Sequence, residues 1–306
     1  MNLHNPKIPV QTIDLRLFFE EYDEKLPQLS ILRTDVTDEQ ISGNKWYKLK
    51  YNLTEAKKKN LPILTFGGAF SNHIAATAAA GEKYGVKTIG VIRGEEHLPL
   101  NSTLQKAKNQ GMELFYLSRT AYRNKYAEEV LTTLKSKFGA FHLVPEGGSN
   151  QLALKGVQEM LSDDTVGFDY IVLASGTGGT TAGLYLAKQK NQKLISIPVL
   201  KGANWMPDEI KQLTDVDLDN SIQFYYNYHF GGYAKINNDL IAFANNFFEK
   251  TNIPLDLIYT TKALCGLFDL IDKKYFSPSD KILFVHTGGL QGNEGLKVQK
   301  QIDLKC

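Results

Sequence analysis

The chain has 306 residues, 42% of them hydrophobic and 22% charged, a balance that allows a globular protein to bury a sizeable core. The 35 Lys and Arg residues against 33 Asp and Glu residues leave a net charge of +2. This balance gives no support to a basic nucleic-acid-binding or membrane-surface protein, and the composition excludes a disordered or fibrous chain.

The cysteines, the histidines and the N-terminal sequence indicate the compartment. No apolar run near the N-terminus is long enough for a signal peptide or a membrane span. Cys265 lies within an apolar helical pattern and Cys306 is the last residue, which does not make a disulfide framework. No CxxC or HExxH pair is present, and the six histidines are scattered. We therefore expect a cytoplasmic protein with no membrane contact, no nucleic-acid partner and no metal site.

Short apolar runs alternate with helix-like stretches along most of the chain. We expect strands within 63–68, 88–94, 113–118, 141–148, 170–179, 194–200 and 282–289. Helix-like stretches include 74–84, 121–138 and 237–250. Continuous apolar runs are typical of strands buried on both faces of a parallel sheet, and the alternation predicts an α/β fold. No Pro/Gly/Ser-rich linker divides the chain, so two domains would require one to be inserted in the other.

Glycines are ordinary in number, 25, but form five adjacent pairs. The pairs are Gly67-Gly68, Gly147-Gly148, Gly178-Gly179, Gly231-Gly232 and Gly288-Gly289. Most of them follow predicted strands, and ligands of open α/β sheets bind outside the carboxyl ends of the strands. Glycine there lets the backbone approach a ligand closely. The pairs indicate one convergent site, although tight turns alone would also need glycine.

The segment 174–183, with the sequence ASGTGGTTAG, follows an apolar run and precedes a predicted helix. Free N–H groups and the helix dipole at such a position favour a phosphate. A Walker A loop needs Gly-Lys-Ser/Thr where this chain has Thr180 and Thr181, and the dinucleotide fingerprint needs an acidic residue about twenty positions later, which is missing. We predict a phosphate site for a ligand other than ATP or NAD; the alternative is a tight strand–helix turn.

Two further segments could carry chemistry. In SGNKWYKLK (42–50), a lysine directly after a Gly-Asn turn would lie near the positive end of a helix dipole. The dipole and desolvation both disfavour the charged amine, as a Schiff-base lysine requires, although composition does not separate Lys45 from Lys48 or Lys50, which would ordinarily be solvated. In FGGAFSNH (66–73), Ser71 and Asn72 either cap a helix or bind a substrate carboxylate.

Taken together, these segments resemble the D-cysteine desulfhydrase / 1-aminocyclopropane-1-carboxylate deaminase family of pyridoxal-phosphate (PLP) enzymes of fold type II, which are tryptophan synthase β-like. The resemblance extends from about Leu32 to Gly292. Its signatures, in order, are GNK at 43–45, SNH at 71–73, GGSN at 147–150, SGTGGTTAGL at 175–184, GGY at 231–233, YTTKALCGL at 259–267 and HTGG at 286–289.

The resemblance implies two open, twisted, mostly parallel α/β sheets. The large PLP-binding domain would comprise residues 1–48 plus 155–306, and the small inserted domain residues 49–154. Pyridoxal 5′-phosphate would lie between them, and the protein would be a homodimer acting on a small amino-acid substrate.

The resemblance also implies roles for individual residues. Lys45 would form the Schiff base with the cofactor, and Asn72 would bind the cofactor's phenolic oxygen. The phosphate cup would comprise Ser175, Gly176, Thr177, Gly178, Gly179 and Thr180. Thr287 would lie beside the pyridine nitrogen.

On the substrate side, the resemblance assigns Ser71, Asn72 and His73 to the loop that receives the carboxylate. Ser71 is also a candidate for proton transfer. Tyr233 and Tyr259 would face the substrate as two further catalytic residues.

Three positions bear on the activity. The deaminases have Glu, Gln and an apolar residue where this chain has Thr260, His73 and Thr287, so the chain is more similar to the desulfhydrases. We expect α,β-elimination from D-cysteine to pyruvate, ammonia and sulfide. The alternatives are deamination of 1-aminocyclopropane-1-carboxylate to 2-oxobutanoate and ammonia, and a binding protein that keeps the fold without this turnover.

Departures from the family leave the substrate and its stereochemistry open. Trp46-Tyr47 replaces a commoner polar pair, and YNYHFGGYAK around Tyr233 is unusual. A serine racemase, a cysteine synthase and a non-enzymatic phosphate-binding module are further alternatives, but the SNH, GGY and HTGG segments favour the desulfhydrase group.

Overall fold

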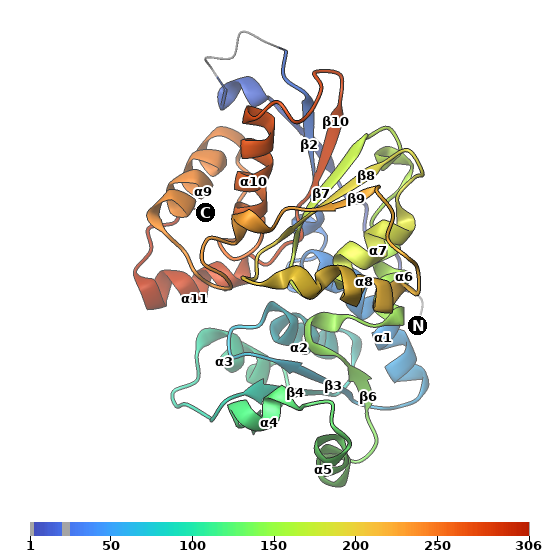
Figure 1. Ribbon diagram of the computed structural model, residues 1–306. Coiled ribbons are helices and arrows are strands. Elements are labelled where there is room, and N and C mark those ends of the chain that lie inside the picture. Colours follow the sequence, from blue (N-terminus) through green and yellow to red (C-terminus); the bar gives the residue numbers. More distant parts are fainter. Residues whose placement is uncertain (1–2, 20–24, 306) are drawn as a thin grey trace.

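The structure is a computed structural model, and it describes residues 3–19 and 25–305, with the side chains of residues 298–300 left out. Cys306, one of the two cysteines considered above, lies outside the described residues. The chain forms two α/β parts, each built on its own sheet (Figure 1).

The larger sheet has six strands in the order β1-β2-β10-β7-β8-β9. Its strands are β1 (Val10–Ile13), β2 (Gln28–Leu32), β7 (Tyr170–Ser175), β8 (Lys193–Pro198), β9 (Ile222–Phe224) and β10 (Lys281–Val285). Only the β1–β2 pair is antiparallel. The central strand β10 sets Phe284 against Ile31 on one side and Val172 on the other, so apolar residues fill the middle of the sheet.

The smaller sheet has four parallel strands in the order β5-β4-β3-β6. These are β3 (Ile63–Gly67), β4 (Thr88–Arg93), β5 (Glu113–Leu117) and β6 (His142–Val144). All four lie within the segment 49–154 that the sequence predicts to be inserted. The prediction of two mostly parallel α/β sheets is thereby confirmed.

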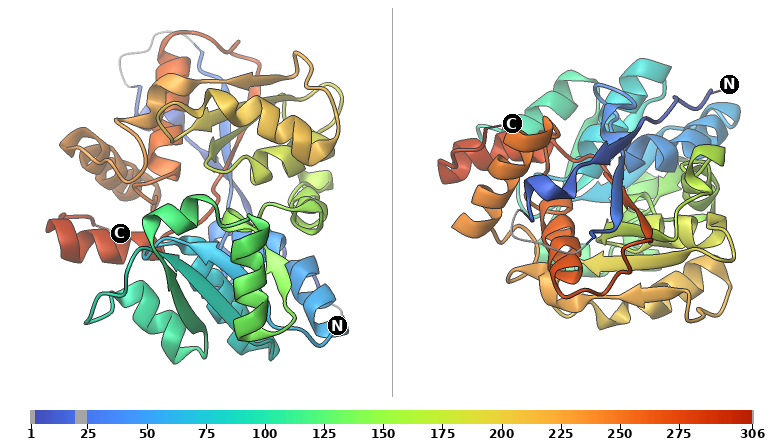
Figure 2. Two further views of the ribbon diagram at one scale, coloured as in Figure 1. Left: turned by 60° about the horizontal axis from the view of Figure 1, so that its bottom comes forward. Right: turned by 90° about the horizontal axis from the view of Figure 1, so that it is seen from above.

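The helices cover both sheets (Figures 1 and 2). They are α1 (Asn44–Lys58), α2 (Asn72–Tyr84), α3 (Ser102–Asn109), α4 (Arg119–Arg123), α5 (Glu128–Phe138), α6 (Gln151–Gln158), α7 (Gly179–Ala187), α8 (Met206–Thr214), α9 (Asn238–Thr251), α10 (Thr260–Asp272) and α11 (Gln291–Lys300). Short 3-10 turns lie at Leu15–Leu17, Thr34–Val36, Glu146–Gly148, Asp163–Thr165, Ala203–Trp205 and Tyr226–His229.

Strand β7 shows why the larger sheet is buried on both faces. Ile171 and Leu173 pack in one hydrophobic cluster with residues of α1, α6 and α7, whereas Val172 and Ala174 pack in another with residues of α10. Successive side chains of a strand point to opposite faces. A strand that is covered on both faces therefore needs the uninterrupted apolar run by which the sequence predicts it.

Two parts of the sequence prediction need correction. The stretch 121–138 is two helices, because Ala127 is extended (φ −63°, ψ 145°) and the chain turns between Asn124 and Ala127. The strands β1, β2 and β9 are not among the strands that the sequence predicts. β1 and β9 are short strands at the sheet edges that mix polar and apolar residues, so they lack the continuous apolar pattern of the central strands.

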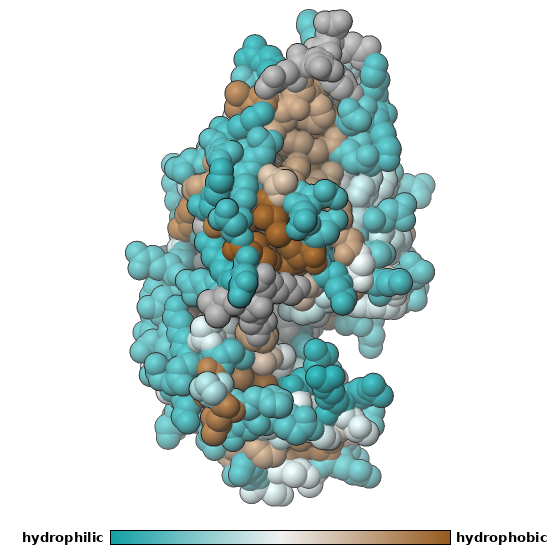
Figure 3. All heavy atoms as spheres, turned by 90° about the vertical axis from the view of Figure 1, so that its left-hand side faces the viewer, coloured by the Kyte–Doolittle hydropathy of each residue, from teal (hydrophilic) through white to brown (hydrophobic). Residues whose placement is uncertain are grey.

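The carboxyl ends of β3 and β7 carry two of the glycine pairs, and the loop after β10 carries another. Helix α1 follows the crossing from the larger sheet and packs mainly on α6. An indentation lies between the two parts on the side shown in Figure 3. In the described part of the chain, no helix is long and apolar enough to cross a membrane.

Candidate active site

One cavity of about 540 Å³ lies at the junction of the two parts. Its lining includes every site residue that the sequence predicts: Lys45, Ser71, Asn72, His73, Ser175, Gly176, Thr177, Gly178, Gly179, Thr180, Tyr233, Tyr259 and Thr287. Residues separated by more than 200 positions in the sequence therefore share one site.

Lys45 lies in the first turn of α1, and its amine donates to Asn44 Oδ1 at 3.0 Å. Loss of solvent lowers the pKa of the amine to about 8, against an opposing attraction from the Asp256 carboxylate. A lysine with this pKa is a substantial fraction neutral near physiological pH, and the neutral amine is the form that attacks an aldehyde.

Gly43 fixes the start of α1 against the loop after β10. Its backbone has φ 72° and ψ −151°, a conformation that only glycine adopts readily. A Cβ atom at this position would lie 2.1 Å from the carbonyl oxygen of Thr287. The N–H of Asn44 donates to that same oxygen at 3.2 Å. The contact brings Thr287 to the same side of the cavity as the start of the lysine helix.

The predicted phosphate cup lies at the start of α7. Gly178 has φ 78°, and no side chain caps the helix, so N–H groups of the first turn lack intrahelical acceptors. The Thr180 hydroxyl accepts from Asn44 Nδ2 at 2.8 Å. The Ser175 hydroxyl is engaged in the interior by Thr181 at 2.6 Å and Ser196 at 2.7 Å, so the part of Ser175 left for a ligand is its backbone.

A second lysine, which the sequence did not single out, lies against the same helix start. Lys48 Nζ donates to the carbonyl oxygen of Gly147 at 2.9 Å and to Ser149 Oγ at 3.4 Å. A Cβ atom on Gly179 would lie 3.0 Å from this amine. Burial and then the charge of Lys45 hold the pKa of Lys48 well below its ordinary value. The sequence held one signal for Lys48: it follows Lys45 by three positions, a spacing that places both lysines on one side of a helix.

Ser71 and Asn72 begin α2 as the sequence predicts. Ser71 Oγ accepts from the backbone N–H groups of His73 and Ile74 at 3.2 and 3.3 Å, which leaves its own proton available. Asn72 Nδ2 donates to the carbonyl oxygen of Gly289 at 3.4 Å. Asn72 thus links the smaller part to the loop after β10.

His73 is buried and directed towards the smaller sheet. The Thr65 hydroxyl donates to the carbonyl oxygen of Val144 at 2.8 Å, so we assign the proton of His73 to Nε2, which lies 2.8 Å from that hydroxyl. His73 Nδ1 is then a buried acceptor without a partner. Burial, followed by the two nearby lysines, holds the pKa of His73 well below its ordinary value. The imidazole is therefore neutral.

Tyr233 and Tyr259 form an edge-to-face pair with ring centroids 6.1 Å apart. Burial raises the pKa of both phenols, and a hydrogen bond from Tyr259 opposes the rise at Tyr233. A Cβ atom on Gly176 would lie 3.0 Å from the Tyr259 ring, so glycine allows the ring to lie close to the cup. The buried Lys262 donates to the carbonyl oxygens of His229 at 3.0 Å and Gly232 at 2.7 Å, which holds the segment before Tyr233.

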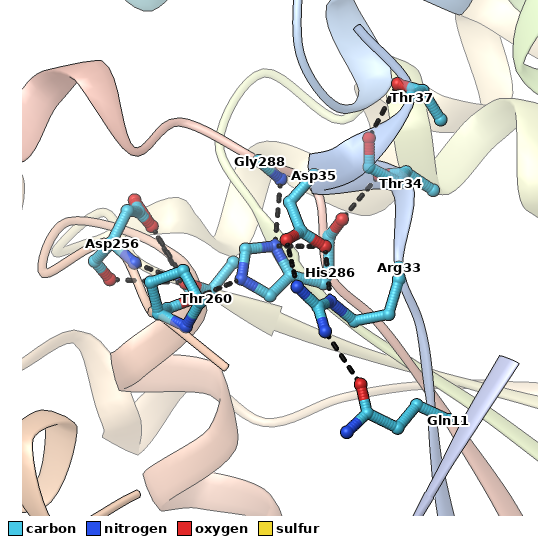
Figure 4. Close-up of polar contacts among 10 residues, drawn as sticks. Gln11, Arg33, Thr34, Asp35, Thr37, Asp256, Thr260, His286 and Gly288 are labelled. Atoms are coloured by element: carbon cyan, nitrogen blue, oxygen red, sulfur yellow. Dashed lines mark hydrogen bonds and ion pairs between the residues drawn. The ribbon is translucent and has the colours of Figure 1, made fainter. Parts of the chain in front are cut away.

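A polar network lies next to the loop that follows β10 (Figure 4). Arg33 and Asp35 form a two-point ion pair with both distances 2.8 Å. Asp35 lies 3.7 Å from His286 Nδ1, which accepts from the N–H of Gly288 at 3.2 Å. His286 Nε2 lies 2.6 Å from the carbonyl oxygen of Pro254 and donates to it. These contacts fix the loop that carries Thr287.

Thr260 belongs to this supporting structure. It is fully buried and does not line the cavity. Its hydroxyl donates to Asp256 Oδ1 at 3.1 Å, and its N–H donates to the same oxygen at 2.7 Å. Burial raises the pKa of Asp256 against these hydrogen bonds. The residue after the second tyrosine therefore shapes the carboxylate environment of Lys45 from outside the cavity.

The residues present fit pyridoxal 5′-phosphate. The cavity offers an amine of lowered pKa for the aldehyde, an uncapped helix start and a second amine for the phosphate, and the Thr287 side chain beside the start of the lysine helix. Glycine at 176 and 179 lets Tyr259 and Ser149 lie close to this helix start, because a Cβ atom at these positions would lie 3.0 Å from the Tyr259 ring and 2.3 Å from Ser149 Oγ. Among residues 3–19 and 25–305, no group of His, Cys, Asp and Glu could hold a metal ion.

A family model described as "Pyridoxal-phosphate dependent enzyme" matches residues 39–288. The chain belongs to this family, and pyridoxal phosphate is its cofactor.

The relatives within the family are more specific. A "Putative 1-aminocyclopropane-1-carboxylate deaminase" of Pyrococcus horikoshii is 34% identical over 86% of this chain and 84% of its own length. The "Bifunctional D-cysteine desulfhydrase/1-aminocyclopropane-1-carboxylate deaminase, mitochondrial" of Arabidopsis thaliana is 30% identical over 87% and 73%. A "D-cysteine desulfhydrase" of Yersinia pestis is 28% identical over 87% and 90%.

The solved structure of an ACC deaminase homologue aligns with a TM-score of 0.77 and 30% identity, covering 95% of this chain and 94% of that chain. A PLP-dependent aspartate racemase aligns with a TM-score of 0.65 at 14% identity, covering 92% and 90%, which shows the shared fold alone.

Proposed function

We propose that this PLP enzyme catalyses α,β-elimination from a small amino acid of the D-cysteine type. D-cysteine and water would give pyruvate, ammonia and hydrogen sulfide. The observation that carries the proposal is the shared cavity of Lys45, the Ser71–Asn72 helix start and Thr287. A base, a carboxylate site and a neutral partner for the ring nitrogen are then available within one pocket.

The bound cofactor supplies delocalisation of the electron pair that remains when the Cα proton leaves. We assign the protein's part as follows. Lys45 binds the cofactor and, when the substrate amine has displaced it, takes the Cα proton. Ser71, with Asn72 and His73 beside it, binds the substrate carboxylate at the start of α2. Ser71 is then placed to pass a proton between the substrate and the base.

The phosphate is held by the loop Ser175–Thr180 and by Lys48, which lies against the same helix start. Asn72 would bind the phenolic oxygen of the ring. Tyr233 and Tyr259 remain protonated at neutral pH because burial raises the pKa of each. They therefore act as hydrogen-bond donors towards the substrate.

Thr287 favours elimination over ring opening. A threonine hydroxyl is a neutral hydrogen-bond partner and does not enforce protonation of the pyridine nitrogen, so charge delocalisation is moderate. A thiolate on Cβ leaves readily, so moderate delocalisation is sufficient for its departure. The opening of a cyclopropane ring would require stronger delocalisation. In addition, this chain has Thr260 at the position where the deaminases that it resembles have glutamate.

Deamination of 1-aminocyclopropane-1-carboxylate is the second candidate. The names of the Pyrococcus horikoshii and Arabidopsis thaliana relatives support it. A pocket that binds the cofactor without this turnover is the third candidate.

A substrate panel separates the three candidates. The purified holoenzyme is incubated with D-cysteine, L-cysteine, β-chloro-D-alanine and 1-aminocyclopropane-1-carboxylate, and sulfide, pyruvate and 2-oxobutanoate are measured. We expect sulfide and pyruvate from D-cysteine. 2-Oxobutanoate from the cyclopropane substrate without sulfide from D-cysteine would establish the deaminase instead. No product from any substrate would favour the binding protein.

We also infer that the protein acts in the cytoplasm as a homodimer, with domains at 1–48 plus 155–306 and at 49–154. The resemblance to the family supports the dimer, as does the apolar area on the face of the larger part seen in Figure 3. The confinement of the four smaller-sheet strands to residues 63–144 supports the domain division.

A further inference from the structure

Arg93 is a cavity residue to which the elimination assigns no task. It is the last residue of β4, lines the cavity and is exposed. A Cβ atom on Gly68 would lie 3.9 Å from its Nη2 atom. Among the residues that the structure describes, no hydrogen bond or ion pair engages the guanidinium group. A cation is thus presented to the cavity without a partner.

The other charges of the cavity are already engaged. Lys45 is assigned to the cofactor, and Lys48 donates to the Gly147 carbonyl oxygen and to Ser149 Oγ. The single acidic residue in the lining, Glu146, forms an ion pair with Lys125 at 3.1 Å. Arg93 is therefore an uncompensated positive charge, and it would be satisfied by an anion on the ligand.

The position of Arg93 associates it with the substrate end. Gly68, which it neighbours, begins the turn that leads to Ser71, since the N–H of Ser71 donates to the carbonyl oxygen of Gly68 at 3.0 Å. Tyr233 lines the same cavity, and the positive charge of Arg93 opposes the rise in pKa that burial causes there. The guanidinium group is thus near the proposed carboxylate loop and shares the cavity with Tyr233.

We propose that Arg93 binds a second carboxylate, carried by the substrate side chain, and that the enzyme prefers cysteine thioethers whose sulfur substituent bears an acid. This inference rests on the proposed elimination. Guanidinium binds carboxylate through two parallel hydrogen bonds, which gives direction as well as charge. A substituent on sulfur extends away from Cα, and Arg93 borders the cavity on the exposed side.

The reaction of such a substrate balances without a further reactant. S-carboxymethyl-D-cysteine loses its Cα proton to the base, and the Cβ–S bond breaks with its electron pair remaining on sulfur. The sulfur takes a proton and leaves as mercaptoacetate. Water hydrolyses the remaining three-carbon fragment to pyruvate and ammonia.

The test compares S-carboxymethyl-D-cysteine with its uncharged amide, S-carbamoylmethyl-D-cysteine, which has nearly the same shape. For both compounds, kcat/KM is measured from pyruvate formation, and Kd for the holoenzyme is measured by calorimetry. We expect the wild-type protein to prefer the acid about tenfold, the scale of one charged hydrogen-bonded contact. Arg93→Gln should bring the ratio close to one, and Arg119→Gln, an exposed arginine outside the cavity lining, should keep it.

Equal values for acid and amide in the wild-type protein would overturn the inference, as would a preference that survives Arg93→Gln. An equal loss for both compounds in Arg93→Gln would mean that Arg93 binds the carboxylate on Cα, which also overturns it. The failure of the proposed function is a separate result. If D-cysteine and both thioethers yield no pyruvate, the elimination is wrong, and the ratio of the two Kd values still decides whether Arg93 selects the acid.

Discussion

The environment of the Lys45 amine bears directly on its proposed role in binding the cofactor. Burial lowers its pKa from 10.5 to about 8. Because the unfolded chain binds this proton more tightly, the unfolded state carries more protons between about pH 8 and pH 10.5, and this group's contribution to the stability of the apoprotein rises with pH across that interval. The same shift makes the nucleophilic amine available at lower pH.

We therefore predict that the rate at which apoprotein takes up pyridoxal phosphate covalently rises with pH through about 8 and then levels off. Stopped-flow absorbance of the Schiff base measures this rate. Lys45→Ala should give no covalent product after borohydride reduction, and peptide mapping of the wild-type protein should find the label on Lys45. A rate that continues to rise to pH 10 would show that the amine has an ordinary pKa.

At the residue scale, the sequence predicts positions better than it predicts contacts. Lys45, Ser71 and Asn72 could be singled out because turn chemistry and capping preferences are local. Lys48 and Arg93 could not be singled out, because a lysine on a helix and an arginine at the end of a strand are ordinarily solvated. Only the folded chain brings these two residues to the cavity. The direction of the His73 ring likewise depends on Thr65, which belongs to another element.

Among the secondary-structure elements, β2 and β10 are joined by a buried charge network as well as by their ladder (Figure 4). The Arg33 and Asp35 side chains are 12% and 1% exposed. When one partner of a buried pair is removed, the other charge is left without compensation, which costs more than the pair contributes. The loop that carries Thr287 depends on this network through His286.

We predict that Arg33→Gln lowers the free energy of unfolding by about 3 kcal/mol, the lower end of the range for breaking a buried pair. Arg16→Gln is the matched control, because the Arg16–Asp14 pair is exposed, and it should lower the free energy of unfolding far less than Arg33→Gln does. Urea denaturation of the apoprotein measures both. Equal effects of the two substitutions would show that the buried network stabilises the protein no more than the exposed pair does.

The elements themselves were predictable where the burial pattern was simple. The seven predicted apolar runs correspond to seven strands, five of which (β3, β4, β7, β8 and β10) are inner strands that need apolar residues along their length. β1 and β9 were not predicted, because these edge strands mix polar and apolar residues, and β2 was not predicted either. The break between α4 and α5 was not predicted. Within it, the Tyr126 hydroxyl accepts from the N–H of Glu146 at 2.8 Å, a contact with a residue 20 positions away that the local sequence pattern does not reveal.

Considered as a whole, the molecule has its cavity at the junction of its two sheets, so the binding of a ligand there would be linked to folding. A group that binds only the folded protein stabilises it in proportion to the logarithm of its concentration over Kd. The cavity draws on α1, α2, α7 and the loop after β10, which belong to both parts.

We predict that pyridoxal phosphate at 100 times its Kd raises the free energy of unfolding by about 2.7 kcal/mol. The measurement is urea denaturation with and without cofactor. Lys45→Ala should gain less at the same concentration, since it retains the phosphate cup but loses the covalent link. A wild-type protein that gains nothing from the cofactor would contradict the assignment of the cavity.

The close contact between Gly43 and the Thr287–Gly288 backbone has a consequence for how this sequence can evolve. A Cβ on Gly43 would meet Thr287, and a Cβ on Gly288 would lie 2.9 Å from Gly43. Neither glycine can therefore be exchanged while the other part of the contact stays in place. Residues 43 and 287–288 are far apart in the sequence, yet a substitution at either glycine would require a compensating change at the other side of the contact.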